Sequence, residues 1–311
     1  MLPVAPQTGR TREGTHPIGQ LEAVGSAFTW ALSTIFLKSQ SDRLNVLAMN
    51  AIRCGTAFVF MLAILIITAR YRAFAFLTPQ ILLSLLLSVT VGMIIGDSLF
   101  FRAQAMLGVA RALPISGAYP IFTLVIAAIF LGEPVTVRAV VGTLLVVGAV
   151  IMIAMPGRSI HASRTPLGDP PSARGFMFAV GAAMGWALST TFLRIGVSHF
   201  DVIAASCIRL PFSALVLALL AWHRGGKGLR MRHLNQQALA IVALAGIIGT
   251  GLGSILFLNA IQLAGAAQSA TLSATAPLWA APMSALLLKE RVQQRVILGI
   301  VVSVSGIWLL L

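Results

Sequence analysis

The stretch GSAFTWALSTIFLK (Gly25–Lys38) decides the fold, because the chain repeats it as GAAMGWALSTTFLR (Gly181–Arg194). The tryptophans of the two copies, Trp30 and Trp186, lie 156 positions apart. Both copies are apolar and of helical character, and each lies near the start of a long hydrophobic half of the chain. The repetition therefore indicates a duplicated membrane unit.

The duplication extends well beyond these two stretches. Arg53 in AIRCG matches Arg209 in CIRLP at the same spacing. At a spacing of 157 the matched residues are Gly96, Ala103, Gly108, Pro120, Glu133 and Gly142 with Gly253, Ala260, Gly265, Pro277, Glu290 and Gly299. Such agreement at one nearly constant spacing is not expected by chance. The two halves are therefore copies of one unit.

The composition is that of an integral membrane protein. Of the 311 residues, 58% are hydrophobic and 10% are charged, whereas soluble domains are roughly a quarter charged. The net charge of +14 comes from cations scattered singly between apolar runs, which favours contact with lipid headgroups over nucleic acid. Cys54 and Cys207 lie inside apolar stretches and cannot form a disulfide framework.

Runs of about 20 apolar residues predict spanning helices, and the chain contains ten of them. They cover approximately 18–37, 45–69, 79–106, 111–131, 135–155, 175–196, 201–222, 236–263, 267–288 and 292–311. We expect a polar tail, a first repeat, a connecting loop rich in Pro, Gly, Ser and Arg, and a second repeat, at 1–17, 18–155, 156–174 and 175–311. Five spans is an odd number, so the two units must cross the membrane in opposite directions. The predicted fold is all-α, with ten transmembrane helices in two inverted five-helix repeats, an architecture typical of secondary transporters.

The stretches FFRAQAMLGVARALPISGAYPIFTLVIAAIFLGEPVT (100–136) and FLNAIQLAGAAQSATLSATAPLWAAPMSALLLKERV (257–292) carry a family resemblance. With the repeated tryptophan helix, they resemble the EamA branch of the drug/metabolite transporter superfamily. The resemblance implies a gradient-driven carrier of small metabolites, often an exporter of amino acids or related compounds, that moves substrate by alternating access. It does not identify the substrate. A passive facilitator and a non-transporting receptor or scaffold stay open as alternatives, as does the choice between monomer and homodimer.

The resemblance and the loop charges disagree about orientation. The resemblance implies a multi-pass protein of the cytoplasmic membrane with both termini cytoplasmic. The Lys and Arg residues in the loops favour the opposite arrangement. If the termini were cytoplasmic, most of these cations would lie on the outer side, whereas cationic loops prefer the cytoplasmic side. We follow the resemblance.

Enzyme chemistry is not expected. The histidines lie in predicted tails, loops or span edges, and GGKG at 225–228 does not match a phosphate-binding loop. We therefore expect no catalytic residue, metal site, cofactor or ATP site, and a small molecule and the lipid bilayer as partners.

Asp97 is the candidate for proton coupling, because it is the acid that lies well inside a predicted span. A charge at the bilayer centre costs about 3 kcal/mol on insertion scales and needs a partner or a function. The alternative is a structural ion pair with Arg102, Arg53 or Arg209. The second half has Ser254 at the equivalent position, so an acid there is not a requirement of both repeats.

Arg53 and Arg209 occupy equivalent positions and either bind an anion or anchor their own repeats. Arg102 matches Asn259, and this asymmetry favours a role in substrate selection. The full set of candidates for lining a substrate cavity is Trp30, Ser33, Thr34, Arg102, Tyr119, Trp186, Ser189, Thr190, Asn259 and Trp279. Helix packing is the alternative interpretation for the two tryptophan motifs, with Gly181 and Gly185 as a small-residue contact.

Pro120 and Pro277 fall at equivalent positions in the middle of predicted spans. A proline inside a helix removes a backbone hydrogen bond, so both are expected to kink their helices. Glu133 and Glu290 lie at predicted span ends, where capping or a local salt bridge is the plain interpretation.

Overall fold

The computed structural model describes residues 16–40, 46–107, 109–154, 173–223, 236–288 and 294–311, and over these ranges the chain is helical without a β-strand. This confirms the all-helical prediction. The first half forms α1 (Pro17–Lys38), α2 (Val46–Ile67), the 3₁₀ segment η1 (Arg70–Phe76), α3 (Pro79–Val89), the π-helical segment η2 (Thr90–Gly96), α4 (Asp97–Leu107), α5 (Val109–Ser116), α6 (Tyr119–Ile126), the π-helical segment η3 (Ala127–Leu131) and α7 (Val137–Ala154). The second half forms α8 (Ala173–Val197), α9 (Val202–His223), α10 (Gln236–Ala245), the π-helical segment η5 (Gly246–Leu252), α11 (Gly253–Ser273), α12 (Ala276–Leu288) and α13 (Gln294–Leu310).

Five helical stretches of the described chain are long and apolar enough to cross a membrane. They are Met49–Ile67, Pro79–Phe100, Ala173–Val197, Val202–Leu220 and Gln236–Ala264. Three further helical stretches are also apolar but shorter. They are Tyr119–Leu131, Val137–Ile153 and Val296–Leu310. The chain is thus a multi-pass membrane protein.

The prediction that Pro120 and Pro277 bend continuous helices is wrong. The predicted span 111–131 consists of α5 and α6, and Pro120 lies in the first turn of α6. Pro277 is the second residue of α12, which begins after the end of α11 at Ser273. The first turn of a helix has no intrahelical acceptor for its amides, so proline is tolerated there. Each proline therefore begins a helix and does not bend one.

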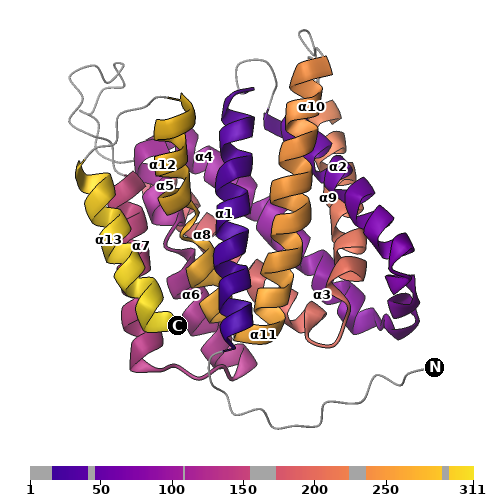
Figure 1. Cartoon of the computed structure of the whole chain (residues 1–311), viewed down its shortest axis with the longest axis horizontal. Coiled ribbons are helices and arrows are strands. Elements are labelled where there is room, and N and C mark those ends of the chain that lie inside the picture. The colour runs from indigo at the N-terminus through magenta and orange to yellow at the C-terminus, as the bar shows by residue number, and fades with distance from the viewer. Residues whose placement is uncertain (1–15, 41–45, 108, 155–172, 224–235, 289–293) are drawn as a thin grey trace.

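The helices pack in pairs that join one half of the chain to the other. α1 lies along α11, α2 along α9, α4 along α8, and α7 along α13. In Figure 1 the pair α7 and α13 lies at one side of the bundle, α2, α3 and α9 lie at the other, and α1 runs between them. The beginning of α1 and the end of α13 are at the same end of the bundle, which we call the termini end.

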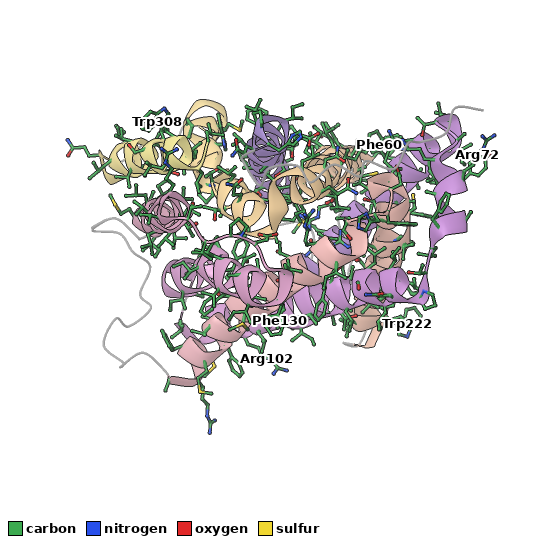
Figure 2. The ribbon with its side chains drawn as sticks, turned by 90° about the horizontal axis from the view of Figure 1, so that it is seen from below. Phe60, Arg72, Arg102, Phe130, Trp222 and Trp308 are labelled. Atoms are coloured by element: carbon green, nitrogen blue, oxygen red, sulfur yellow. The ribbon has the colours of Figure 1, made fainter. Side chains whose placement is uncertain are left out.

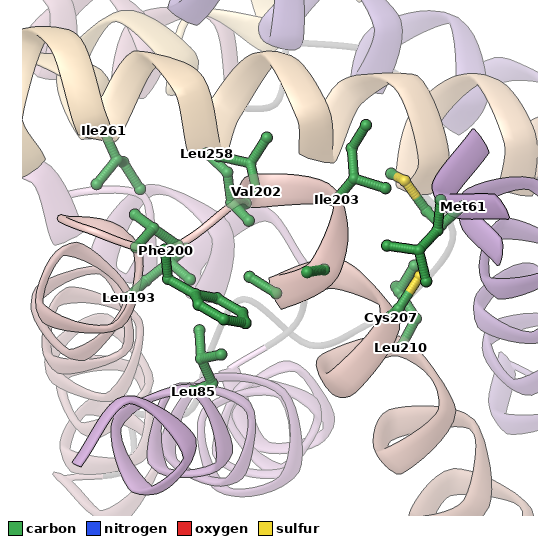
Figure 3. Packing of buried hydrophobic residues seen from close by; sticks show 14 of the residues in the cluster. Met61, Leu85, Leu193, Phe200, Val202, Ile203, Cys207, Leu210, Leu258 and Ile261 are labelled. Carbon is green, nitrogen blue, oxygen red and sulfur yellow. The ribbon is translucent and has the colours of Figure 1, made fainter. Parts of the chain in front are cut away.

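The largest apolar core lies where α2, α3, α8, α9 and α11 meet (Figure 3). Met61, Leu85, Phe200, Leu258 and Ile261 are buried in it. By contrast, large apolar side chains cover the outside. Trp222, Phe130 and Trp308 are 72%, 73% and 76% exposed, and Figure 2 shows them at the periphery of the molecule. Extensive exposed apolar surface is typical of a protein that contacts lipid.

Side-chain caps set where several helices begin. Asp201 precedes α9, and its Oδ1 accepts the amides of Ile203 and Ala204 at 3.0 Å each. The same carboxylate pairs with Arg70 at 3.0 Å. Thr78 Oγ1 accepts the amide of Ile81 at the start of α3. These caps satisfy amides that have no partner inside their own helices.

Candidate functional site

The two repeated tryptophan helices, α1 and α8, pack against the π-helical segments of the opposite halves. Ser33 Oγ donates to the carbonyl of Ala245 at 2.9 Å, and Ser189 Oγ donates to the carbonyl of Ser88 at 2.6 Å. A Cβ at Gly249 would overlap Ser33 in the same way that one at Gly92 would overlap Ser189. These hydroxyls therefore serve packing between the halves.

The tryptophans make the same aromatic contact in both halves. Trp30 and Phe257 have ring centroids 5.1 Å apart at 58°, and Trp186 and Phe100 have centroids 5.2 Å apart at 57°. Phe257 and Phe100 are themselves 157 positions apart. The contacts are thus related by the sequence repeat, and each one joins the two halves. The two-repeat architecture is visible in the side-chain contacts as well as in the sequence.

Asp97 breaks this symmetry. Its Oδ1 accepts a hydrogen bond of 2.8 Å from Trp186 Nε1. Tyr119 lies edge-on to the same indole ring, with centroids 6.0 Å apart. Arg53 acts on the carboxylate electrostatically. In the second half, Ser254 follows Gly253 where Asp97 follows Gly96, so Trp30 meets no carboxylate at the equivalent position.

The two matched arginines also differ in their surroundings. Arg209 Nε donates to Ser88 Oγ at 3.1 Å. Arg53 Nε is buried and has no hydrogen-bond partner among the described residues. The sequence explains the difference, because Ala245 occupies the position in the second half that Ser88 occupies in the first. Arg53 thus lacks the hydroxyl group that its counterpart has.

Arg102 and Asn259, the other asymmetric pair, do not join this group. Arg102 is exposed, its guanidinium carbon lies 5.9 Å from the ring centroid of Phe178, and Figure 2 shows it at the edge of the molecule. Asn259 Nδ2 donates to Glu22 Oε1 at 3.1 Å. Sequence reasoning missed Glu22, whose Oε2 is buried without a partner among the described residues, because it lies close to the start of the predicted first span.

The other candidates make contacts of their own, away from Asp97. Thr34 and Thr190 donate to the carbonyls of Trp30 and Trp186 in their own helices, at 2.8 and 3.0 Å. Tyr119 donates to the carbonyl of Ala270 at 3.1 Å. Trp279 packs edge-on to Phe28 with centroids 5.6 Å apart, and its Nε1 is buried without a partner in the described chain. Tyr119 is the one among these whose side chain packs against the Trp186 ring that holds Asp97.

A cavity of about 820 Å³ lies elsewhere, at the termini end. Its walls include Glu133, Arg138, Arg194, Gln262 and Gly265, and none of the residues predicted to line a substrate cavity is among them. Glu133 caps a helix, as the capping interpretation proposes, but that helix is the second part of α11 in the opposite half. In the sequence repeat, Gly108 matches Gly265 and Glu133 matches Glu290. These matches do not reveal that Glu133 contacts the helix that begins after Gly265. Gly108 and Glu290 lie outside the described residues.

We call Asp97, Trp186, Arg53, Arg209 and Ser88 the interior polar group. It contains two guanidinium groups and one carboxylate. Its residues lie on α2, α3 and α4 of the first half, which pack against α8 and α9 of the second half. A carboxylate held by a neutral indole N–H keeps capacity for a proton or a cation. A guanidinium with nitrogens free to donate can bind a carboxylate or phosphate through two parallel hydrogen bonds.

The chain belongs to the EamA-like transporter family, whose model matches residues 17–155 and again 173–311. It is therefore a membrane transporter of the drug/metabolite type. An uncharacterised transporter of Archaeoglobus fulgidus is 26% identical over 291 residues, which is 94% of this chain and 97% of the relative. An uncharacterised protein of Pseudomonas aeruginosa is 31% identical over 201 residues, covering 64% of this chain and 63% of the relative.

A solved crystal structure has the same fold, with a TM-score of 0.75 at 16% sequence identity. The superposition covers 94% of this chain and 95% of that chain. This likeness extends over both matched repeats. Transporters of the EamA-like family are generally not enzymes.

Proposed function

We propose that this protein is a secondary transporter of a small metabolite, built as ten spans in two inverted five-helix repeats at 18–155 and 175–311. In this proposal, substrate binds between the repeats at the interior polar group. The repeats then rock about their shared contacts and expose the site alternately to the two sides of the membrane. The gradient of protons supplies the energy.

The observation that carries the proposal is the position of Asp97 between the two halves. It lies on α4 of the first half and is held by Trp186 on α8 of the second half. A charge on Asp97 therefore acts at the contact that rocking must alter. Buried ionisable residues inside membrane proteins commonly mark ion pathways and proton relays, and this placement supports proton coupling through Asp97.

The charges support an amino acid or a related compound as substrate. Asp97 can accept hydrogen bonds from a substrate ammonium group, whereas Arg53 Nε has no partner in the described part of the chain and can donate to a substrate carboxylate. The two residues act on each other electrostatically. A zwitterion with one charge of each sign complements this pair. Arg209 is held by Ser88 and is a structural residue in the proposal.

The test begins with the purified full chain and a panel of metabolites that contains amino acids, carboxylic acids and amines. Ligands that raise the melting temperature are then offered to proteoliposomes with and without an imposed pH gradient. We expect an amino acid or a close relative to stabilise the protein and to accumulate against its own gradient when the pH gradient is present. Binding without flux would favour a receptor or scaffold, and flux that only follows the substrate gradient would favour a passive facilitator.

We also propose that both termini are cytoplasmic. The family resemblance supports this orientation, whereas the distribution of Lys and Arg in the loops opposes it. A reporter enzyme that is active only outside the cell, fused after Leu311, distinguishes the two arrangements. We expect it to be inactive, and activity of this fusion would reverse the assignment.

A further inference from the structure

α11 is broken at Gly265, where the backbone has φ 85° and ψ 172°. This conformation is open to glycine and strained for other residues. The break separates residues 253–264 from residues 266–273 and leaves carbonyl groups at the end of one part and amide groups at the start of the other. In a membrane-spanning region such groups need partners from the protein or from water in a cavity.

Two charged side chains supply these partners. Arg194 of α8 donates from one terminal nitrogen to the carbonyls of Ile261 and Gln262, at 2.8 and 2.7 Å. Glu133, in the connection before α7, accepts the amide of Ala266 at 2.6 Å on Oε1 and that of Ala267 at 3.0 Å on Oε2. Each charge has the sign that the helix end favours, because a helix C-terminus attracts cations and an N-terminus attracts anions.

Glu133 and Arg194 also come close to each other. Arg194 Nε lies 3.9 Å from Glu133 Oε1, and the two side chains are 30% and 17% exposed, in the order Arg194 and Glu133. Glu133 comes from the first half of the chain, whereas Arg194 and α11 belong to the second half. The break in α11 is therefore held by residues of both halves. An ordinary cap within one helix would not link them.

The segment 266–273 connects the cavity at the termini end with the interior polar group. At its start, Ala267 and Gln268 line the cavity together with Glu133. Further along, the carbonyl of Ala270 accepts a hydrogen bond from Tyr119, whose ring lies against Trp186, the partner of Asp97. Thr271 Oγ1 is within 3.0 Å of Thr143 Oγ1 on α7. The segment thus lies between the cavity at the termini end and the Asp97–Trp186 pair.

We propose that segment 266–273 is the gate between the cavity at the termini end and the interior polar group, and that Glu133 and Arg194 are its positioning residues. The inference rests on the proposed transport function. In the closed gate, both charged side chains hold the two ends of the break. Opening releases the amides of Ala266 and Ala267 from Glu133, and residues 266–273 then move away from α7 and Tyr119.

The gate predicts a local change in accessibility that needs no substrate to observe. Thr143 lines the cavity and is 2% exposed, and its Oγ1 lies 3.0 Å from Thr271 Oγ1 of the gate segment. We introduce a thiol by Thr143→Cys in the full chain and measure its rate of reaction with a membrane-impermeant maleimide in detergent. Labelled sites are separated by peptide mass spectrometry, so that the buried native Cys54 reports general opening of the fold in the same sample.

Glu133→Gln should raise the labelling rate at position 143 about tenfold or more and leave Cys54 unchanged, a shift equivalent to 1.4 kcal/mol in the gate equilibrium. Arg138→Gln is the matched control, since Arg138 lines the same cavity and is exposed; we expect less than a twofold change. Ser198→Cys, at an exposed position in the cavity wall, should react rapidly in every variant. If Glu133→Gln does not elute as a monodisperse protein, Arg194→Gln takes its place, and the same rise in labelling at position 143 is expected.

An unchanged rate at position 143 in monodisperse Glu133→Gln would overturn the gate, as would an equal rise at position 143 and at Cys54. Either result leaves the transport proposal intact, because labelling does not depend on flux. Conversely, a protein that shows the predicted labelling but no flux retains the gate and loses the transport function. Glu133→Asp keeps the charge on a shorter side chain, and we expect it to restore slow labelling in part.

Discussion

The half of the interior around Trp186 and the half around Trp30 share their packing but differ in their charges. Both tryptophans contact a phenylalanine of the opposite half at nearly the same distance, and both neighbouring serines bond to a carbonyl across the interface. Trp186 additionally holds Asp97, whereas the second half has Ser254 at the equivalent position. The shared contacts join the halves, and we propose that the unshared groups select the substrate.

The two arginines give the largest expected contrast. Arg53→Gln should weaken substrate binding about 10- to 100-fold, because a charge-assisted hydrogen bond contributes about 1.5–3 kcal/mol. Arg209→Gln should chiefly lower the melting temperature, because Arg209 is already bonded to Ser88. Titration calorimetry and thermal unfolding of both variants separate the two effects. A larger loss of affinity in Arg209→Gln would reverse the roles that we assign.

The tryptophans test whether the indole N–H matters beyond packing. Trp186→Phe removes the hydrogen bond to Asp97, so we expect gradient-driven flux to fall about tenfold. Trp30→Phe loses a similar amount of packing without a carboxylate at the equivalent position, so its flux should fall about threefold or less. The two initial rates in proteoliposomes, measured at equal protein content, make the comparison. Equal losses would mean that the rings serve packing alone.

A smaller effect should follow from making the two arginine sites alike. Ala245→Ser places a hydroxyl where Ser88 provides one for Arg209, and it should occupy Arg53 in the same way. We expect substrate affinity to fall about two- to tenfold, since a neutral hydrogen bond contributes about 0.5–1.5 kcal/mol. Binding isotherms measure this change. An unaltered affinity would indicate that Arg53 does not contact the substrate.

The shared serine contacts should respond equally. Ser33→Ala and Ser189→Ala each remove one hydrogen bond to a carbonyl of the opposite half, and each should cost about 1 kcal/mol of stability. Denaturant or thermal unfolding in one detergent compares them. A difference of more than about 1 kcal/mol between the two variants would show that the halves do not share this contact energetically.

Much of this comparison could be predicted from the sequence. The spacing of the repeat located both tryptophan helices, both arginines and the asymmetry of Asp97 against Ser254. It could not show which contacts cross between the halves, because a repeat spacing relates equivalent residues and says nothing of their neighbours. For this reason the sequence did not show that Ser88 bonds to Arg209. It also did not show that the Arg102 side chain is exposed, because exposure depends on packing.

The helix breaks were predicted at the wrong residues for a related reason. A proline in an apolar run indicates that a helix is interrupted, but it does not decide whether the proline lies inside a helix or begins a new one. Pro120 and Pro277 begin helices. Gly265 interrupts α11 because Glu133 and Arg194 satisfy the freed backbone groups, and both of these residues are distant in sequence. Such compensation cannot be inferred from the residues around the glycine.

The most direct test of the central claim, that Asp97 couples substrate movement to protons, compares Asp97→Asn with Ser254→Ala. Both variants are reconstituted in proteoliposomes, and substrate uptake is measured with and without an imposed pH gradient. We predict that Asp97→Asn loses the acceleration by the gradient while substrate exchange at equal pH persists, and that Ser254→Ala retains both. Full gradient-driven uptake by Asp97→Asn would contradict the account.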